Sequence, residues 1–180
     1  MVLYGARGLT AREEAHRLLE RAAGEHWGLA CLGELAREER GKPYLPGHPQ
    51  FQFNLSHSGG LVLCGGGCAP LGVDLEAVRP RRAGLARYIC SPEEYAWYEK
   101  LGGDWESLYT IWTLKEARVK CTGKGLRQLP NTIAVPLIGP GQTGTLDGLT
   151  FRAYRGQGWR GAVCCAPPEL PPEAVGRPDL

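Results

Sequence analysis

Apolar residues near the N-terminus follow first the pattern of a strand and then that of a helix. The run Val2–Tyr4 is short and apolar, as expected of a strand. From Ala11 to Ala22, apolar residues recur at helical spacing, which predicts an amphipathic helix that ends at Gly24. Thr10 and Glu13 have the spacing of a capping box in front of that helix. The pattern therefore predicts a strand followed by a helix.

Three further strands are predicted before residue 70. Leu29–Leu35 is one of them. Phe51–Ser56 alternates apolar and polar residues, Leu61–Cys64 is continuously apolar, and a turn at Ser58–Gly60 joins the two. Gly41–Gly47 contains prolines that fix φ and donate no backbone hydrogen bond, so we expect a rigid connection there.

The rest of the chain predicts a second set of elements. After a turn at Gly65–Gly67, a strand is expected at Leu71–Glu76. A short helix is expected within Arg79–Arg87, and Ser91–Leu101 begins with an N-cap, a first-turn proline and a glutamate at N3. Asp104–Cys121 is amphipathic, with a buried stripe of Leu108, Ile111, Trp112 and Val119. Three candidate strands follow, the first two separated by a glycine-rich hairpin loop: Thr132–Ile138, Leu149–Tyr154 and Trp159–Cys165.

The order of these elements repeats once along the chain. A strand, a helix and three strands are followed by a strand, helices and three strands. This order predicts an α+β protein of two similar halves, residues 1–70 and 71–166, which meet near Cys68–Leu71 and hold a site in the cleft between them. Residues 167–180 contain five prolines and are expected to form a loose tail.

Composition and charge exclude several classes of function. A net charge of +2 is too small to argue for a nucleic-acid partner. No apolar run approaches the roughly 20 residues that cross a bilayer, and Met1–Thr10 lacks the apolar core of a secretory signal. We therefore expect a cytoplasmic protein with no membrane partner. The seven cysteines form no C-x-x-C pair, and Cys64 and Cys68 lack a second pair of zinc ligands, so all are expected to be reduced core residues.

Two acidic residues in one predicted strand are candidates for metal binding. Asp74 and Glu76 are two positions apart, so both carboxylates leave one face of the strand while Val73 and Leu75 enter the core. Two carboxylates this close repel each other unless a cation lies between them, and such hard oxygen ligands suit Mg²⁺ or Mn²⁺. The alternative is the solvent-facing polar side of an edge strand.

A glutamate and a lysine share one face of the long predicted helix. Glu116 and Lys120 are four residues apart, so a carboxylate and an ammonium project together. The commoner explanation of this spacing is a surface ion pair. Lys115 lies about 100° away around the helix and is expected to take no part in the chemistry.

Polar side chains also follow a predicted strand end at Asn54–Ser58. Its hydroxyls and imidazole are suited to donating hydrogen bonds to phosphate oxygens. A Ser-His-Asp hydrolase is not supported, because no G-x-S-x-G elbow surrounds either serine. Together with Asp74, Glu76, Glu116 and Lys120, this segment predicts a metal-assisted site for phosphoryl chemistry.

In combination, these motifs resemble those of the Sfp-type 4′-phosphopantetheinyl transferases. The matching segments occur in the family's order: Gly41–Pro43, Phe53–Ser58, Gly72–Glu76, Trp112–Lys120 and Gly123–Leu126. The resemblance implies a pseudo-duplicated α+β fold with the active site between its halves. It also implies transfer of 4′-phosphopantetheine from coenzyme A to a serine of an apo acyl or peptidyl carrier protein, with release of adenosine 3′,5′-bisphosphate. A cytoplasmic monomer serving fatty acid, polyketide or nonribosomal peptide synthesis would fit this family.

The resemblance further implies roles for individual residues. Asp74, Glu76 and Glu116 match the family's Mg²⁺ ligands, and Mn²⁺ is a possible substitute. Glu116 also matches the general base, and Lys120 matches the lysine that neutralises the pyrophosphate. The residues that match coenzyme A contacts are Arg17, Lys42, Pro43, Ser56, His57 and Lys120.

One departure from the family concerns the 3′-phosphate of coenzyme A. Arg7 is the only basic residue before the first predicted helix, whereas family members carry a longer basic region there. We therefore expect Arg12, Arg17, Lys42 and His57 to hold this phosphate.

Basic residues in and after the long predicted helix are candidates for contact with a carrier protein. Arg118, Lys124 and Arg127 are expected to meet an acidic carrier helix.

One alternative function is a module that binds coenzyme A or a carrier protein without transfer. Another is a Mg²⁺-dependent phosphohydrolase of nucleotides, which would turn over coenzyme A without a carrier.

Overall fold

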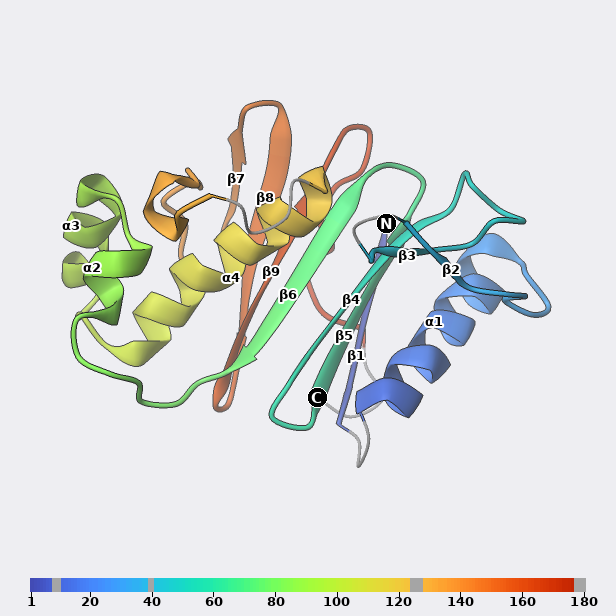
Figure 1. The fold of residues 1–180 in the computed structure, drawn as a ribbon, viewed down its shortest axis with the longest axis horizontal. Helices are drawn as coiled ribbons and strands as arrows, with labels where there is room; N and C mark the ends of the chain where they lie inside the picture. Colours follow the sequence, from blue (N-terminus) through green and yellow to red (C-terminus); the bar gives the residue numbers. More distant parts are fainter. Residues whose placement is uncertain (8–10, 39–40, 124–127, 177–180) are drawn as a thin grey trace.

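The N-terminal half of the chain forms a three-stranded antiparallel sheet with one helix packed on it (Figure 1). The computed structural model describes residues 1–7, 11–38, 41–123 and 128–176. The strand order is β1-β5-β4, and a two-stranded β2-β3 ribbon lies outside this sheet. Leu19 of the helix shares a buried cluster with Phe53 and Val62 of the sheet. The elements are β1 (Val2–Arg7), α1 (Ala11–Trp27), β2 (Ala36–Arg37), β3 (Pro43–Tyr44), β4 (Gln52–Ser58) and β5 (Leu61–Gly67).

The C-terminal half forms a four-stranded antiparallel sheet in the order β6-β9-β8-β7. One long helix, α4, lies against this sheet, and its Leu114 and Ala117 share a buried cluster with Phe151 and Cys164 of the strands (Figure 1). The elements are β6 (Leu71–Ala77), α2 (Leu85–Ile89), α3 (Pro92–Lys100), α4 (Trp105–Thr122), the 3-10 helix η1 (Pro130–Thr132), β7 (Thr143–Leu146), β8 (Leu149–Gly156) and β9 (Trp159–Cys165).

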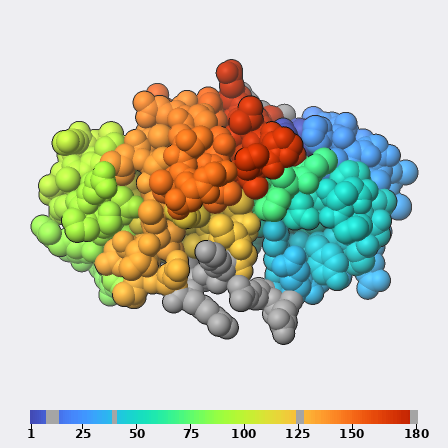
Figure 2. Space-filling view, turned by 90° about the horizontal axis from the view of Figure 1, so that it is seen from above, coloured from blue at the N-terminus to red at the C-terminus, as the bar shows by residue number. Residues whose placement is uncertain are grey.

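A third buried cluster joins the two sheets. It contains Leu63 of β5, Val73 of β6 and Val163 of β9. The sheets approach closely at Gly65, where an added Cβ would lie 2.6 Å from Val73 Cγ1. In the space-filling view the two halves of the chain occupy opposite ends of the molecule (Figure 2). The strand β6 therefore lies at the boundary between the halves.

Two helices have ends that capping residues in the sequence account for. Ser91 and Glu94 form the predicted capping box at the start of α3. Asp104 caps α4, and Gly123 ends that helix with a φ of 66° that glycine adopts without strain. The first helix continues past Gly24 to Trp27, because the left-handed C-terminal position is supplied by Gly28, at φ 68°. The Thr10 capping box lies outside the described residues.

Several predicted strands and turns are wrong. Leu29–Leu35 is not a strand, since it pairs with no strand in the described ranges and its Leu32 is buried in the cluster under α1. Gly65–Gly67 is not a turn but the end of β5, where the absence of side chains lets neighbouring groups approach. Thr132–Ile138 contains the end of η1 and irregular backbone, although Ile133 and Ile138 are buried. The short strand β7, Thr143–Leu146, was not predicted because it lacks an apolar run.

In place of the expected loose tail, residues 167–176 contact the rest of the chain. The Glu169 carboxylate accepts a hydrogen bond from the N-terminal ammonium of Met1 at 2.6 Å. Tyr154 Oη donates to the Pro172 carbonyl at 2.6 Å, and Gly176 pairs with β1 through the Leu3 carbonyl and the Gly5 N–H. These contacts hold the segment against both sheets, and Figure 2 shows the red C-terminal residues over the boundary between the halves.

Two further expectations from composition can be compared with the fold. No helix within the described ranges is both long enough and apolar enough to span a membrane. All seven cysteines are free thiols, and five of them are buried as predicted. Cys31 and Cys68 are exposed, so the expectation of a core position is wrong for these two.

Candidate active site

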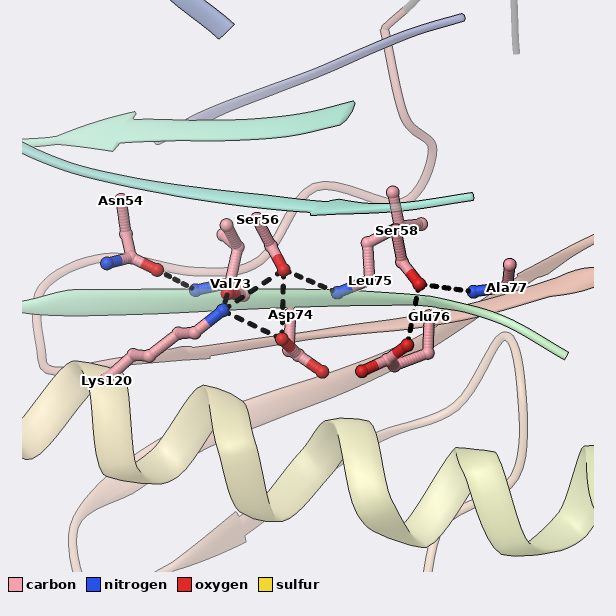
Figure 3. A network of polar contacts seen from close by, with 9 residues as sticks. All are labelled: Asn54, Ser56, Ser58, Val73, Asp74, Leu75, Glu76, Ala77 and Lys120. Atoms are coloured by element: carbon pink, nitrogen blue, oxygen red, sulfur yellow. Dashed lines mark hydrogen bonds and ion pairs between the residues drawn. The ribbon is translucent and has the colours of Figure 1, made fainter. Parts of the chain in front are cut away.

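The predicted carboxylate pair lies on the face of β6 that is turned toward α4 (Figure 3). Asp74 is buried, with 4% of its surface exposed, and Glu76 is half-buried. Val73 and Leu75 point to the opposite face and are buried between the two sheets. The solvent-facing alternative is therefore wrong for Asp74.

A third carboxylate, Glu116 of α4, interacts with this pair. The pKa of Glu116 is raised to about 7, chiefly by burial and then by the negative charge of Asp74; Glu76 contributes in the same direction, and Lys120 opposes the shift. Because repulsion between carboxylates depends on proximity, these interactions indicate that the three acidic groups occupy one region. The helix and the strand thus bring together residues that are forty positions apart in the sequence.

Lys120 is bonded to the same strand from the α4 side. Its Nζ donates to Asp74 Oδ1 at 2.8 Å, to the Val73 carbonyl at 3.0 Å and to Ser56 Oγ at 3.1 Å (Figure 3). The other carboxylate oxygen, Asp74 Oδ2, is buried and has no hydrogen-bond partner among the described residues. Lys120 therefore pairs with Asp74 across the boundary between the elements, and not with Glu116 as a surface ion pair.

Side chains of β4 contact the free edge of β6. The Val73 N–H donates to Asn54 Oδ1 at 3.0 Å, the Leu75 N–H donates to Ser56 Oγ at 3.1 Å, and the Ala77 N–H donates to Ser58 Oγ at 3.2 Å (Figure 3). Each hydroxyl then donates to a carboxylate, Ser56 to Asp74 and Ser58 to Glu76. The two sheets are thus linked here through side chains in place of a backbone ladder.

Two cavities lie along α4, on either side of the position of Glu116. The smaller, of about 230 Å³, is lined among the described residues by Glu38, Gly41, Lys42, Pro43, Asn54, Val119, Lys120 and Gly123. The larger, of about 500 Å³, has an apolar lining from Leu85, Ile89, Leu108 and Trp112, with Glu76, Arg81, Arg82, Tyr88 and Tyr109 completing it. The sequence did not predict this larger cavity, although the spacing of Leu108 and Trp112 placed both on one helix face. Trp112 lines the cavity and is only half-buried.

Comparisons of the sequence with protein families and with individual proteins agree on one family. A family model described as the 4′-phosphopantetheinyl transferase superfamily matches residues 70–164. A 4′-phosphopantetheinyl transferase of Bacillus subtilis is 32% identical over 174 residues, which covers 88% of this chain and 78% of the relative. The chain belongs to this superfamily. The transferase Sfp of Bacillus subtilis strain 168 is 32% identical over 144 residues, covering 74% of this chain and 63% of Sfp. The transferase HetI of Nostoc is 37% identical over 100 residues, covering 51% of this chain and 42% of HetI.

The remaining predicted site residues of the transferase lie in different surroundings. Lys42 and Pro43 line the smaller cavity together with Lys120. His57 follows Ser56 in β4, so its side chain leaves the opposite face of the strand, where it is exposed. Arg17 is exposed on α1 and forms an ion pair with Glu14 at 3.0 Å. Neither His57 nor Arg17 lines the two cavities, and the side chain of Arg12 lies outside the described residues.

The lysine beside Glu116 has a structural role in the transferase. Lys115 is fully buried, and its Nζ forms an ion pair with Glu94 of α3 at 2.7 Å. It also donates to the carbonyls of Pro130, at 2.9 Å, and Ile133, at 2.6 Å. Its contacts are thus with α3 and the segment after α4, in agreement with the prediction that it points away from the site.

The basic residues expected to meet a carrier protein can be placed only in part. Arg118 donates to Asp147 at 2.5 Å and to the Ala134 carbonyl at 2.5 Å, so its guanidinium is engaged within the chain. Lys124 and Arg127 lie outside the described residues.

The donor set of the site can be compared with the requirements of a divalent cation. In the described part of the chain, no group of three or more His, Cys, Asp and Glu side chains has the arrangement of a metal site. Even so, Asp74 Oδ2 is buried without a partner, and buried polar atoms normally have one. Carboxylate oxygens of Asp74, Glu76 and Glu116 are also the ligands that Mg²⁺ prefers. The carboxylates of Asp74, Glu76 and Glu116 are therefore chemically suited to bind a hard divalent cation.

Proposed function

We propose that this transferase moves the 4′-phosphopantetheine group of coenzyme A to a serine of an apo acyl or peptidyl carrier protein. The observation that best supports the proposal is the grouping of Asp74, Glu76, Glu116 and Lys120 beside two cavities. In the reaction the serine oxygen bonds to the phosphorus of the pantetheine phosphate. The bond from that phosphorus to the bridging oxygen breaks, and adenosine 3′,5′-bisphosphate leaves with the bridging oxygen.

Glu116 is proposed to accept the proton of the carrier serine. A serine hydroxyl is a weak nucleophile, so its attack requires a positioned base. A general base is most effective when its pKa lies near the working pH, and the pKa of Glu116 is raised to about 7 by burial and by its acidic neighbours. The same carboxylate remains anionic more readily once a cation lies beside it.

Asp74, Glu76 and Glu116 are proposed to hold Mg²⁺, with Mn²⁺ as a substitute. The bound ion would neutralise charge on the pyrophosphate and stabilise the transferring phosphoryl group. Lys120 is proposed to add a positive charge at the same place, since its Nζ lies 2.8 Å from Asp74 Oδ1 and its side chain lines the smaller cavity.

The two cavities suggest how coenzyme A is oriented. We propose that the nucleotide and its phosphates occupy the smaller cavity, where Lys42, Pro43 and Lys120 lie, and that His57 and Arg17 approach from outside it. The pantetheine arm would then extend past Glu116 toward the larger apolar cavity beside Glu76. The pyrophosphate would then lie beside Glu116 of α4, between the two cavities.

The two halves of the chain, residues 1–70 and 71–166, are proposed to enclose this site as a pseudo-duplicated pair. In support, the bonded groups come from β4 in one half and from β6 and α4 in the other. We also propose that the protein acts as a cytoplasmic monomer. A binding module without transfer is less well supported, because binding alone does not require the full set of three carboxylates and Lys120.

Transfer is tested by comparing two glutamine variants with the wild-type protein. Each is incubated with coenzyme A, Mg²⁺ and several apo carriers, and the carriers are examined by mass spectrometry. Glu116→Gln is expected to lose transfer, whereas Glu99→Gln, a control at an exposed position of α3, is expected to retain it. Consumption of coenzyme A without a carrier would favour a phosphohydrolase instead. Wild-type transfer by Glu116→Gln would remove this residue from the mechanism.

A further inference from the structure

Ser56 and Ser58 of β4 repeat the same arrangement at a spacing of two residues. Ser56 Oγ accepts from the Leu75 N–H at 3.1 Å and donates to Asp74 Oδ1 at 2.9 Å. Ser58 Oγ accepts from the Ala77 N–H at 3.2 Å and donates to Glu76 Oε2 at 2.7 Å. Figure 3 shows both hydroxyls between β4 and the carboxylates. The repetition follows from the two-residue period shared by the strands.

The backbone of β6 determines where each hydroxyl proton points. A serine hydroxyl has one proton to donate and two lone pairs to accept with. Because each Oγ already accepts a backbone N–H, its own proton is directed to the carboxylate. Ser56 Oγ also accepts from Lys120 Nζ at 3.1 Å, so all of its hydrogen-bonding capacity is used. A phosphate oxygen could bind the Ser56 hydroxyl only by displacing Asp74, which argues against the phosphate contact predicted from the sequence.

We propose that Ser56 and Ser58 are positioning residues that orient the Asp74 and Glu76 carboxylates toward a divalent cation. This inference rests on the proposed function, because it concerns the same metal-binding carboxylates. Each hydroxyl fixes one carboxylate oxygen, Oδ1 of Asp74 and Oε2 of Glu76. In Asp74 the second oxygen, Oδ2, is thereby held in a buried position, where the part of the chain that the structure describes offers it no hydrogen-bond partner. Groups that hydrogen-bond to metal ligands in this way set ligand orientation.

The two serines differ in how much their carboxylates depend on them. Asp74 Oδ1 also accepts from Lys120 Nζ at 2.8 Å, so this carboxylate keeps one anchor when Ser56 is lost. For Glu76, the described contacts give Ser58 as the hydrogen-bonding side chain. Removal of the Ser58 hydroxyl should therefore weaken metal binding more than removal of the Ser56 hydroxyl. Loss of a hydrogen-bonding partner to a metal ligand typically weakens metal affinity about 10- to 100-fold.

The test measures Mn²⁺ affinity of the full chain by electron paramagnetic resonance, without coenzyme A. Ser58→Ala is expected to bind Mn²⁺ at least about tenfold more weakly than wild type, and Ser58→Thr, which keeps a hydroxyl, is expected to restore most of the affinity. Asn54→Ala is the matched control, since Asn54 accepts the Val73 N–H in the same row but bonds no carboxylate. Its Mn²⁺ affinity is expected to stay near the wild-type value.

Equal Mn²⁺ affinity in wild type and folded Ser58→Ala would overturn the proposal, as would an equal loss in Asn54→Ala. If Ser58→Ala does not fold, Ser58→Cys replaces it, because a thiol is a weak donor of similar shape. The Cys variant must then show the weakened affinity. Failure of the proposed function is recognised separately, by the absence of phosphopantetheine on carriers treated with the wild-type protein.

Discussion

The buried Lys115–Glu94 pair makes a strong prediction about stability. Lys115 is fully buried and Glu94 is 3% exposed, and their shortest distance is 2.7 Å. All three donors of the ammonium are used, by Glu94, the Pro130 carbonyl and the Ile133 carbonyl. Removing one member of a buried ion pair typically costs about 3–5 kcal/mol, because the other charge is left without a partner. We therefore expect Lys115→Met to lower the free energy of unfolding by about 4 kcal/mol.

A double-mutant cycle separates the pair from its surroundings. Glu94 also accepts the Ser91 N–H at 2.7 Å in the capping box of α3, so glutamine is used there to keep an acceptor. Glu94→Gln alone leaves the Lys115 charge buried, whereas Glu94→Gln with Lys115→Met removes both charges. The double variant should lose less stability than the sum of the single losses, by about 2 kcal/mol or more.

The assay is urea unfolding followed by tryptophan fluorescence, with the exposed Lys100→Met on α3 as control. That control is expected to change the free energy of unfolding by less than about 0.5 kcal/mol. Additive losses in the cycle, or a loss of under about 1 kcal/mol in Lys115→Met, would refute the reasoning that this pair is energetically coupled.

Three further predictions concern the site and the packing around it. Glu116→Gln should reduce transfer about 10²- to 10⁴-fold while the circular dichroism spectrum stays unchanged; a small loss would show that Glu116 is not the base. Since the folded-state pKa of Glu116 is raised from 4.5 to about 7, this carboxyl stabilises the fold at low pH and the contribution is lost as the pH rises through 7. Glu116→Gln should thus raise the urea midpoint more at pH 8 than at pH 5, and an equal change at both would contradict the shift. At Gly72 an added Cβ would lie 2.2 Å from the Ala117 carbonyl oxygen, so Gly72→Ala should displace α4 and lower the free energy of unfolding by about 3 kcal/mol or more. The control Gly47→Ala, with open space around the added Cβ, should lower it little. Equal unfolding midpoints in the two variants would contradict this expectation.

The sequence predicted best those elements whose signals are local. The Ser91–Glu94 capping box fixes the start of α3 through neighbouring residues, and it was predicted correctly. The apolar residues of Leu29–Leu35 predict a strand, but apolar residues alone cannot show whether a partner strand exists. In the structure Leu32 is buried against α1 without one. Whether Leu29–Leu35 forms a strand therefore depends on pairing with distant residues, which the local sequence does not show.

The site was predictable to a similar degree. The alternation in β6 placed Asp74 and Glu76 on one face, as the structure confirms (Figure 3). The hydrogen bond from the Leu75 N–H to the Ser56 hydroxyl could not be predicted, since it depends on β4 lying along the edge of β6. Arg81, in the loop between β6 and α2, and Tyr109 of α4 both line the larger cavity, with 3.1 Å between Nε and Oη. No local sequence signal links these two segments.

We expect the wild-type chain to carry out phosphopantetheine transfer. The most direct measurement is the intact mass of an apo carrier protein after incubation with the chain, coenzyme A and Mg²⁺, with fragmentation to locate the modified residue. We predict a mass increase of one phosphopantetheine group on the carrier serine, with one adenosine 3′,5′-bisphosphate released for each group transferred. Unmodified carriers from fatty acid, polyketide and peptide synthesis alike would contradict the account.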